Sequence, residues 1–275
     1  MSALAASFKQ ISGIVRSDRP LSDTQIIKAA PSVFAESAHE SRSSRYAYIP
    51  TSDVLNGLRR EGFQPFMACQ ARTRTEGKQE YTTHMLRLRH QSQINGDTAI
   101  EIILVNSHDG TSSYQMLAGC YRFVCENGLI SGETVEDFRV RHSGNVVGNV
   151  IEGAFRVLDE FKLVDSSKET MQGIILRPRQ QEVLASAALQ LRYDPEQNVP
   201  IEPQQLNQAR RMDDRGNDLW KTFNRVQENL MQGGLQGHNA NGGKTTTRRV
   251  SSVSENIRLN RALWTLADEM AKMAA

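Results

Sequence analysis

Two neighbouring stretches of the chain, residues 66–74 and 81–90, alternate in side-chain character. Arg72 and Arg74 are two residues apart in the first stretch, and Arg87 and Arg89 are two residues apart in the second. Leu86 and Leu88 alternate with the second pair. Successive side chains of a β-strand point to opposite faces of the sheet, so each stretch places its arginines on one face. The glycine-containing segment between the stretches has the length of a hairpin loop. The pattern predicts a β-hairpin with a cationic face and a largely apolar one.

A cationic sheet face suits a phosphate backbone, because each basic side chain can neutralise one phosphate. The predicted phosphate-binding residues of the hairpin are Arg72, Arg74, Lys78, Arg87 and Arg89. The alternative to phosphate binding is that this face is only solvated, since exposed strands carry Arg and Lys to prevent edge-to-edge association. No acidic residue lies within 72–74 or 87–89, which favours binding.

A second basic cluster precedes the hairpin. Arg42 and Arg45 lie in a serine-rich stretch, where guanidinium groups and hydroxyls could together hold phosphate. Tyr46 and Tyr48 follow directly and could stack on bases. We expect the four residues to extend the nucleic-acid surface, with a solvated loop as the alternative.

Whole-chain quantities set limits on location and chemistry. The 275 residues carry a net charge of only +2, so a nucleic-acid surface must be a local patch. Three cysteines give no disulfide framework and suggest a reducing compartment. No apolar run reaches the ~20 residues that span a bilayer, and the N-terminus lacks the apolar core of a secretory signal. We expect a cytoplasmic protein that does not contact a membrane.

The remaining patterns predict an α+β fold. A capping box at Ser22 opens a short helix, a second helix begins at Thr51 or Ser52 and ends at Gly62, and residues 99–105 form an apolar central strand. Residues 112–126 are expected to be helical, and 134–142 a further strand. Helical periodicity then recurs from Val146, in 183–191, in 219–230 and in 253–273.

This order predicts four parts of the chain. Residues 1–142 form an α+β domain with an antiparallel sheet and the basic hairpin, and residues 143–232 are mainly helical. Residues 233–250, rich in Gly, Asn and Thr, are expected to be a flexible linker. Residues 251–275 form a C-terminal amphipathic helix.

Catalytic and metal-binding motifs are not found. The histidines and cysteines lack the spacing of a metal site, and Ser107, His108 and Asp109 are adjacent in sequence, which is the wrong geometry for a triad. The phosphate-loop pattern that ends at Lys244 has His238 where glycine is required. We therefore expect no catalytic residue, metal or cofactor, and a protein that is not an enzyme.

Five segments resemble a known family: SRYAYIP (44–50), EGFQP (61–65), HMLRLR (84–89), RFVCENG (122–128) and WKTFNRVQENL (220–230). They are similar to phage- and plasmid-type proteins that share a domain of unknown function. The resemblance implies a protein of bacterial mobile elements. The expected order of a helix, three strands and a helix also resembles that of phage and Rad-type single-strand annealing proteins, in which protomers form rings or filaments.

Together these features predict a non-enzymatic protein that binds single-stranded DNA and promotes annealing, with self-association through its C-terminal helices. The alternative is an interaction protein that counters a host defence or replication factor. Its interface would contain Trp220, Phe223 and Trp264.

Overall fold

The computed structural model describes residues 13–43, 46, 48–90, 98–112, 114–122, 127–130, 146–159, 161–194 and 198–274. The chain forms two compact units. The first contains Met1–Phe123 and Val135–Phe161, and the second contains Val124–Thr134 and Lys162–Ala275. No helix in the described ranges is long and apolar enough to cross a membrane. The α+β class that the sequence predicts is confirmed.

The first unit is built on an antiparallel sheet whose first five strands follow one another in chain order. The strands are β1 (Ile14–Arg16), β2 (Phe63–Gln70), β3 (His84–His90), β4 (Thr98–Asn106) and β5 (Gln115–Arg122). The predicted hairpin is present as β2 and β3, in a register that pairs Cys69 with Met85. Strand β2 ends at Gln70 and β3 begins at His84, so Arg72 and Arg74, which were expected on a strand, lie in the loop with Lys78.

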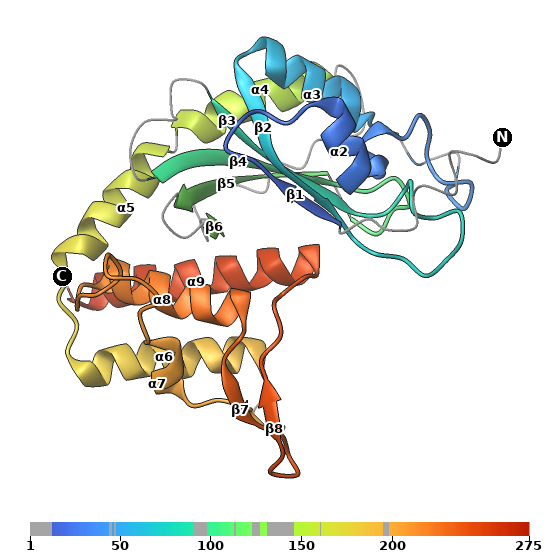
Figure 1. The fold of residues 1–275 in the computed structure, drawn as a ribbon. Helices are drawn as coiled ribbons and strands as arrows, with labels where there is room; N and C mark the ends of the chain where they lie inside the picture. The colour runs from blue at the N-terminus through green and yellow to red at the C-terminus, as the bar shows by residue number, and fades with distance from the viewer. Residues whose placement is uncertain are drawn as a thin grey trace. The chain divides into compact units, whose positions relative to one another are not determined.

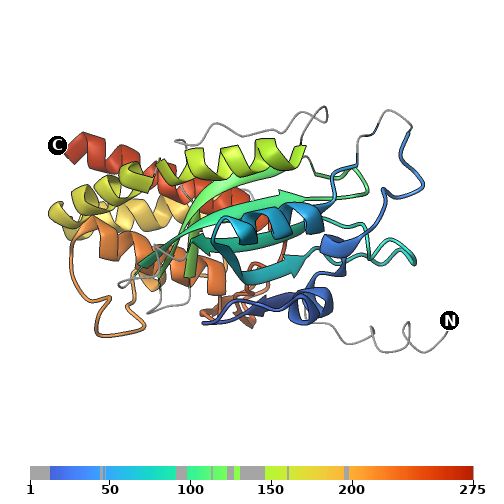
Figure 2. The same cartoon turned by 90° about the horizontal axis from the view of Figure 1, so that it is seen from above.

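Helices cover one face of this sheet (Figures 1 and 2). They are α2 (Asp23–Ala29), the short 3-10 helix η2 (Pro31–Phe34), α3 (Thr51–Arg60) and α4 (Val146–Asp159). The predicted capping box opens α2, where the Ser22 side chain accepts from the Gln25 amide. Helix α4, which we expected in the helical part, belongs to the first unit.

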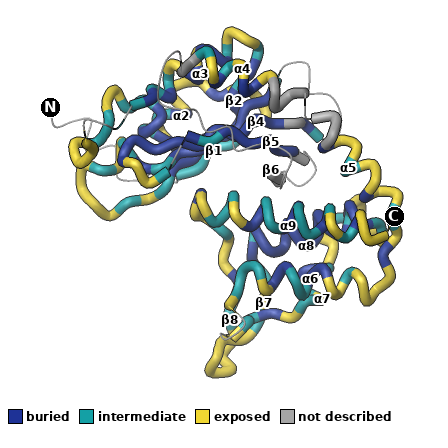
Figure 3. Tube along the Cα trace, turned by 180° about the vertical axis from the view of Figure 1, so that it is seen from behind, coloured by how far each residue is buried: buried dark blue, intermediate teal, exposed yellow. Residues whose placement is uncertain are grey.

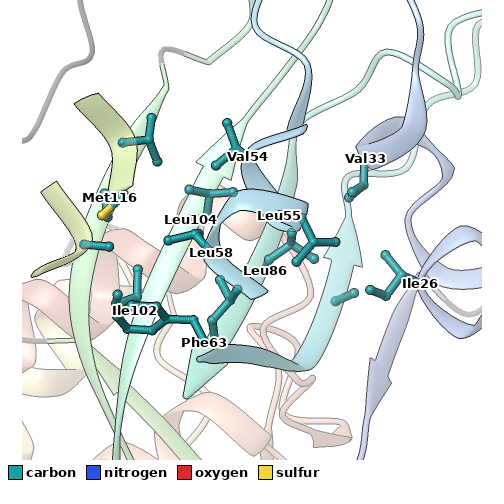
Figure 4. Packing of buried hydrophobic residues seen from close by; sticks show 14 of the residues in the cluster. Ile26, Val33, Val54, Leu55, Leu58, Phe63, Leu86, Ile102, Leu104 and Met116 are labelled. Atoms are coloured by element: carbon teal, nitrogen blue, oxygen red, sulfur yellow. The ribbon is translucent and has the colours of Figure 1, made fainter. Parts of the chain in front are cut away.

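The core of the first unit lies between these helices and the sheet (Figure 4). Leu55 and Leu58 of α3 pack with Leu86 and Leu88 of β3 and with other apolar side chains of the sheet. Because Leu86 and Leu88 face the helices, Arg87 and Arg89 lie on the opposite face of β3. The predicted alternation of the second hairpin strand is therefore present.

Strand β5 corrects a prediction, because residues 112–126 were expected to form a helix. Met116 and Ala118 instead pack into the core on alternate positions of a strand that pairs with β4. Leu, Met and Ala favour helices, and Asn127–Gly128 resembles a helix stop. Pairing with a long apolar neighbour outweighs these local preferences. The strand expected at 134–142 lies outside the described residues.

The second unit is mainly helical. It contains most of α5 (Phe161–Gly173), and α6 (Pro178–Arg192), α7 (Pro203–Leu206), α8 (Leu219–Gln232) and α9 (Val253–Ala274), with the short strand β6 (Asn127–Ile130) against α9. The expected interface aromatics are buried here: Trp220, Phe223 and Trp264 pack on one another with ring centroids 5.9–6.3 Å apart. These three side chains are part of the hydrophobic core of the second unit. This corrects the prediction that they form an interface with a partner protein.

Residues 233–250 also differ from the expected flexible linker. They contain β7 (Gln236–His238) and β8 (Lys244–Thr246), which pair as an antiparallel hairpin. Gly233 closes α8 with φ of +65°, in the left-handed region that glycine favours. Low-complexity composition therefore coincides here with ordered β-structure.

Candidate nucleic-acid interface

Two of the predicted phosphate-binding residues, Arg87 and Arg89, are buried in the sheet. Their exposed fractions are 4% and 2%, and that of Glu101 on β4 is 0%. Arg87 Nη1 donates to Glu101 Oε2 at 3.0 Å, and Arg89 Nε donates to Glu101 Oε1 at 2.9 Å. The sequence has no acidic residue within 87–89, but Glu101 on the neighbouring strand pairs with both arginines.

The register of the sheet explains this arrangement. Arg89 lies directly opposite Glu101, and Arg87 lies opposite Ile103, two residues further along β4. Side chains on one face of adjacent strands reach both direct and diagonal neighbours, so a single carboxylate serves both guanidinium groups. Burial lowers the pKa of Arg87, while the charge of Glu101 acts in the opposite direction. These two arginines are paired within the sheet and do not form a solvent-facing surface for phosphate.

The other three predicted cations of the hairpin are accessible. Arg72 and Arg74 are exposed and Lys78 is partly exposed, all in the loop of residues 71–83. None of their side chains forms an ion pair or hydrogen bond with another described residue. The same loop also carries Glu76 and Glu80, so its excess of positive charge is small. These cations remain available to a ligand.

Three loops meet at one end of the sheet: residues 35–50, 71–83 and 107–114. We call this region the loop end. His39 N donates to His108 O at 2.9 Å, and His108 N and Asp109 N both donate to Tyr81 O, at 2.9 and 3.1 Å. The loops extend from the same end of the sheet in two perpendicular views (Figures 1 and 2). Backbone hydrogen bonds therefore fix the loops to one another.

Arg42 belongs to the loop end and is exposed. Its guanidinium lies against Gly110, where an added Cβ would be 2.5 Å from Nη1, and its Nη2 donates to Ser41 Oγ at 3.3 Å. This contact connects the predicted second basic cluster with the 107–114 loop. Arg45 lies outside the described residues.

Tyr46 and Tyr48 are half-buried and use their hydroxyl groups to anchor the first loop. Tyr46 Oη donates to Ser107 O at 2.8 Å, and Tyr48 Oη donates to Ala35 O. The Tyr48 ring lies 5.0 Å from the His108 ring, centroid to centroid, and burial raises the pKa of Tyr48 to about 12. Both tyrosines thus position the loop, and stacking on bases remains a prediction for their accessible ring surface.

A buried polar network beneath the loop end was not predicted. His84 is fully buried, with Nδ1 2.9 Å from Ser32 Oγ and Nε2 2.9 Å from Thr51 Oγ1. Asn106 Nδ2 donates to Thr51 Oγ1 at 3.0 Å, and Ser32 Oγ donates to Gln70 Oε1 at 2.9 Å. The sequence offers one signal, which is that His84 shares parity with the core-facing leucines of β3. The network joins η2, α3 and three strand ends into one framework.

The loop end does not form a Ser-His-Asp relay. Ser107 Oγ donates to Ser112 O, the Asp109 carboxylate accepts from Thr111, and neither ring nitrogen of His108 has a hydrogen-bond partner among the described residues. Burial lowers the pKa of His84 to about 3 and that of His108 to about 4, so both rings are neutral at pH 7. Within the described ranges, no group of three or more His, Cys, Asp or Glu could hold a metal ion. The accessible side chains of the loop end include cations, aromatic rings and the carboxylates of Glu36, Glu40, Glu76 and Glu80.

Comparison with known proteins places the chain in a family. Residues 38–264 match the family model described as "Domain of unknown function (DUF932)". Two proteins of Escherichia coli (strain K12), "UPF0380 protein YafZ" and "UPF0380 protein YfjQ", are each 50% identical over 270 residues, which cover 98% of both chains. No solved structure matches. The chain therefore belongs to the DUF932 family.

Proposed function

We propose that this protein binds nucleic acid at the loop end, with single-stranded DNA as its main ligand. The observation that supports the proposal most directly is the exposure of Arg42, Arg72 and Arg74, together with Lys78, on loops that hydrogen bonds hold at one end of the sheet. Loops that hydrogen bonds already fix lose less backbone entropy when their cations bind a phosphate backbone than mobile loops would. The neighbouring tyrosine rings supply aromatic surface for stacking.

The proposed mechanism needs no chemical step. Cations hold the phosphate backbone and leave base edges free to sample a complementary strand, so binding promotes annealing. Self-association would place several such surfaces along one strand and raise the effective concentration of the second strand. A role in recombination of phage or plasmid DNA is consistent with the family resemblance in the sequence.

The test is a charge reversal in the loop, Arg72→Glu with Arg74→Glu, measured by fluorescence anisotropy with a labelled single-stranded oligonucleotide. Each lost phosphate contact lowers the slope of log affinity against log salt by ~0.7 for single strands. We expect weaker binding, a shallower salt slope and unchanged thermal stability, because both side chains are exposed.

A matched control reverses charge elsewhere on the first unit. Arg60→Glu changes an exposed arginine near the end of α3, outside the loop end. If Arg60→Glu weakens binding as much as the single replacement Arg72→Glu, net charge alone governs the affinity and the site assignment is wrong. Unchanged affinity in the loop variant would also refute it.

The alternative function is binding of a host protein, and one feature of the second unit favours it. Ile175, Val183 and Met273 are 70%, 56% and 87% exposed, which is unusual for large apolar side chains. Val183 and Met273 also line an apolar pocket between α6 and α9. Under this alternative, capture of a partner would be insensitive to salt and to nuclease, and Val183→Asp would abolish it. DNA binding that depends on the loop arginines would instead favour the main proposal.

A further inference from the structure

The first strand of the β7–β8 hairpin packs along its length against the chain that precedes α7, where Asn198 Nδ2 also donates to His238 O at 2.9 Å. His238 N donates to Pro200 O at 2.9 Å, and Gln205 Nε2 donates to Gln236 O at 2.8 Å. Gly237 packs so closely on the preceding chain that an added Cβ would lie 1.7 Å from Pro200 O. The hairpin therefore projects in one fixed direction from the segment that precedes α7.

The tip of the hairpin is narrow and ordered. Asn239 Oδ1 accepts from Asn241 N at 3.0 Å and from Gly243 N at 2.9 Å. Gly242 has φ of +74°, and no atom lies within 4 Å of where its Cβ would be. Figure 3 shows the tip as exposed chain beyond β8. Residues 198–200 flank β7 up to His238, so the turn of residues 239–243 is the part of the hairpin that stands clear of the preceding chain.

The chain in and around the hairpin carries positive charge and no negative charge. Residues 229–254 contain no Asp or Glu, although the chain has 31 of them, and they contain Lys244, Arg248 and Arg249. On the strands, Gln236 pairs with Thr246 and His238 pairs with Lys244, and all four are exposed. The outward face of the hairpin thus has one cation and no carboxylate of its own, and Glu202 lines the hollow beside it.

These features fit a duplex groove. The major groove of B-DNA admits a two-stranded β-ribbon, and polar side chains on such a ribbon can reach base edges and phosphates. Helix α8, which leads into the hairpin, is buried along nearly its whole length and offers no face to a groove. The hairpin is therefore the element of this region that is shaped and charged to enter one.

We infer that the β7–β8 hairpin is a second nucleic-acid-binding element, which contacts the duplex through Lys244 and its outward polar face. The inference rests on the proposed function and extends it, because it gives the protein separate contacts for a single strand and for the duplex that annealing produces. Lys244 binds phosphate, and His238 and Gln236 lie beside it to contact the groove.

The experiment compares full-length wild type with Lys244→Glu, using anisotropy with a labelled duplex and with one of its strands across a salt series. Loss of a phosphate contact weakens binding and lowers the salt slope by ~1. We expect a several-fold loss of duplex affinity with a smaller change for the single strand. Arg215→Glu is the control, since Arg215 is an exposed cation of the same unit outside the hairpin.

Each outcome decides the inference. Equal duplex affinity in wild type and Lys244→Glu overturns it, as does an equal loss in the Arg215→Glu control or a wild type that does not bind duplex. The loop variant Arg72→Glu with Arg74→Glu separates the two claims. If it retains single-strand affinity while Lys244→Glu loses duplex affinity, the loop-end site fails and the hairpin assignment stands.

Discussion

Replacement of the buried carboxylate of Glu101 is the sharpest structural test of this account. Glu101→Gln keeps the shape of the side chain and removes its charge, so that Arg87 and Arg89 remain buried without the carboxylate that both contact at 2.9–3.0 Å. Removing one partner of a buried ion pair costs about 3–5 kcal/mol, because the buried guanidinium groups lose a charge of opposite sign. Since whole domains are stable by about 5–15 kcal/mol, the loss should be large in this protein.

The assay is urea unfolding at pH 7 followed by circular dichroism. Fluorescence would report on the wrong unit, since both tryptophans, Trp220 and Trp264, lie in the second unit. Glu76→Gln is the matched control, because Glu76 is exposed in the neighbouring loop and its replacement should change stability by less than about 0.5 kcal/mol.

A second variant separates charge from packing. The triple replacement Arg87→Met, Arg89→Met and Glu101→Leu removes all three charges of this buried cluster, and stability should recover toward that of wild type. A loss below about 1 kcal/mol in Glu101→Gln would refute the reasoning, since that magnitude is typical of exposed ion pairs.

Three further outcomes are expected. Because folding lowers the pKa of His84 to about 3 and of His108 to about 4, the unfolded chain binds protons first as the pH falls below 6.5. The free energy of unfolding should therefore decrease between pH 6.5 and 4, by up to about 1.4 kcal/mol per pH unit for each ring. The decrease should be less steep in His84→Gln than in wild type, and an equal slope in the two proteins would contradict this. Gly237→Ala should destabilise the second unit more than Gly242→Ala, as measured by tryptophan fluorescence in urea. The first Cβ would lie 1.7 Å from a backbone oxygen, whereas the second meets open space and costs only the strain of a positive φ. Ser22→Ala should cost about 1 kcal/mol by dichroism through loss of its cap on α2, and no change would exclude the capping box.

Local signals in the sequence predicted those elements that depend on local physics. The capping box at Ser22, the alternation in β3 and the apolar periodicity of α9 each act within a few residues, and each element is present. Residues 115–122 were predicted wrongly because their side chains suit a helix, and only pairing with β4 makes them a strand.

The candidate site was harder to predict because it depends on strand register. Glu101 lies 12 and 14 residues beyond Arg89 and Arg87, and its contact with them follows only once β3 and β4 are aligned. The sequence does contain a hint, which is a single carboxylate within the apolar run of β4. Order in the β7–β8 hairpin likewise depends on Gly237 packing against Pro200, a contact between distant positions.

The most direct test of the central claim is the binding of wild-type protein to labelled single-stranded and duplex oligonucleotides, titrated by fluorescence anisotropy across a salt series. The account predicts tight binding to the single strand that weakens steeply as salt rises, because exposed cations at the loop end displace counterions from phosphates. Absence of binding at low salt would contradict it, and the exposed arginines would then be a solvated surface.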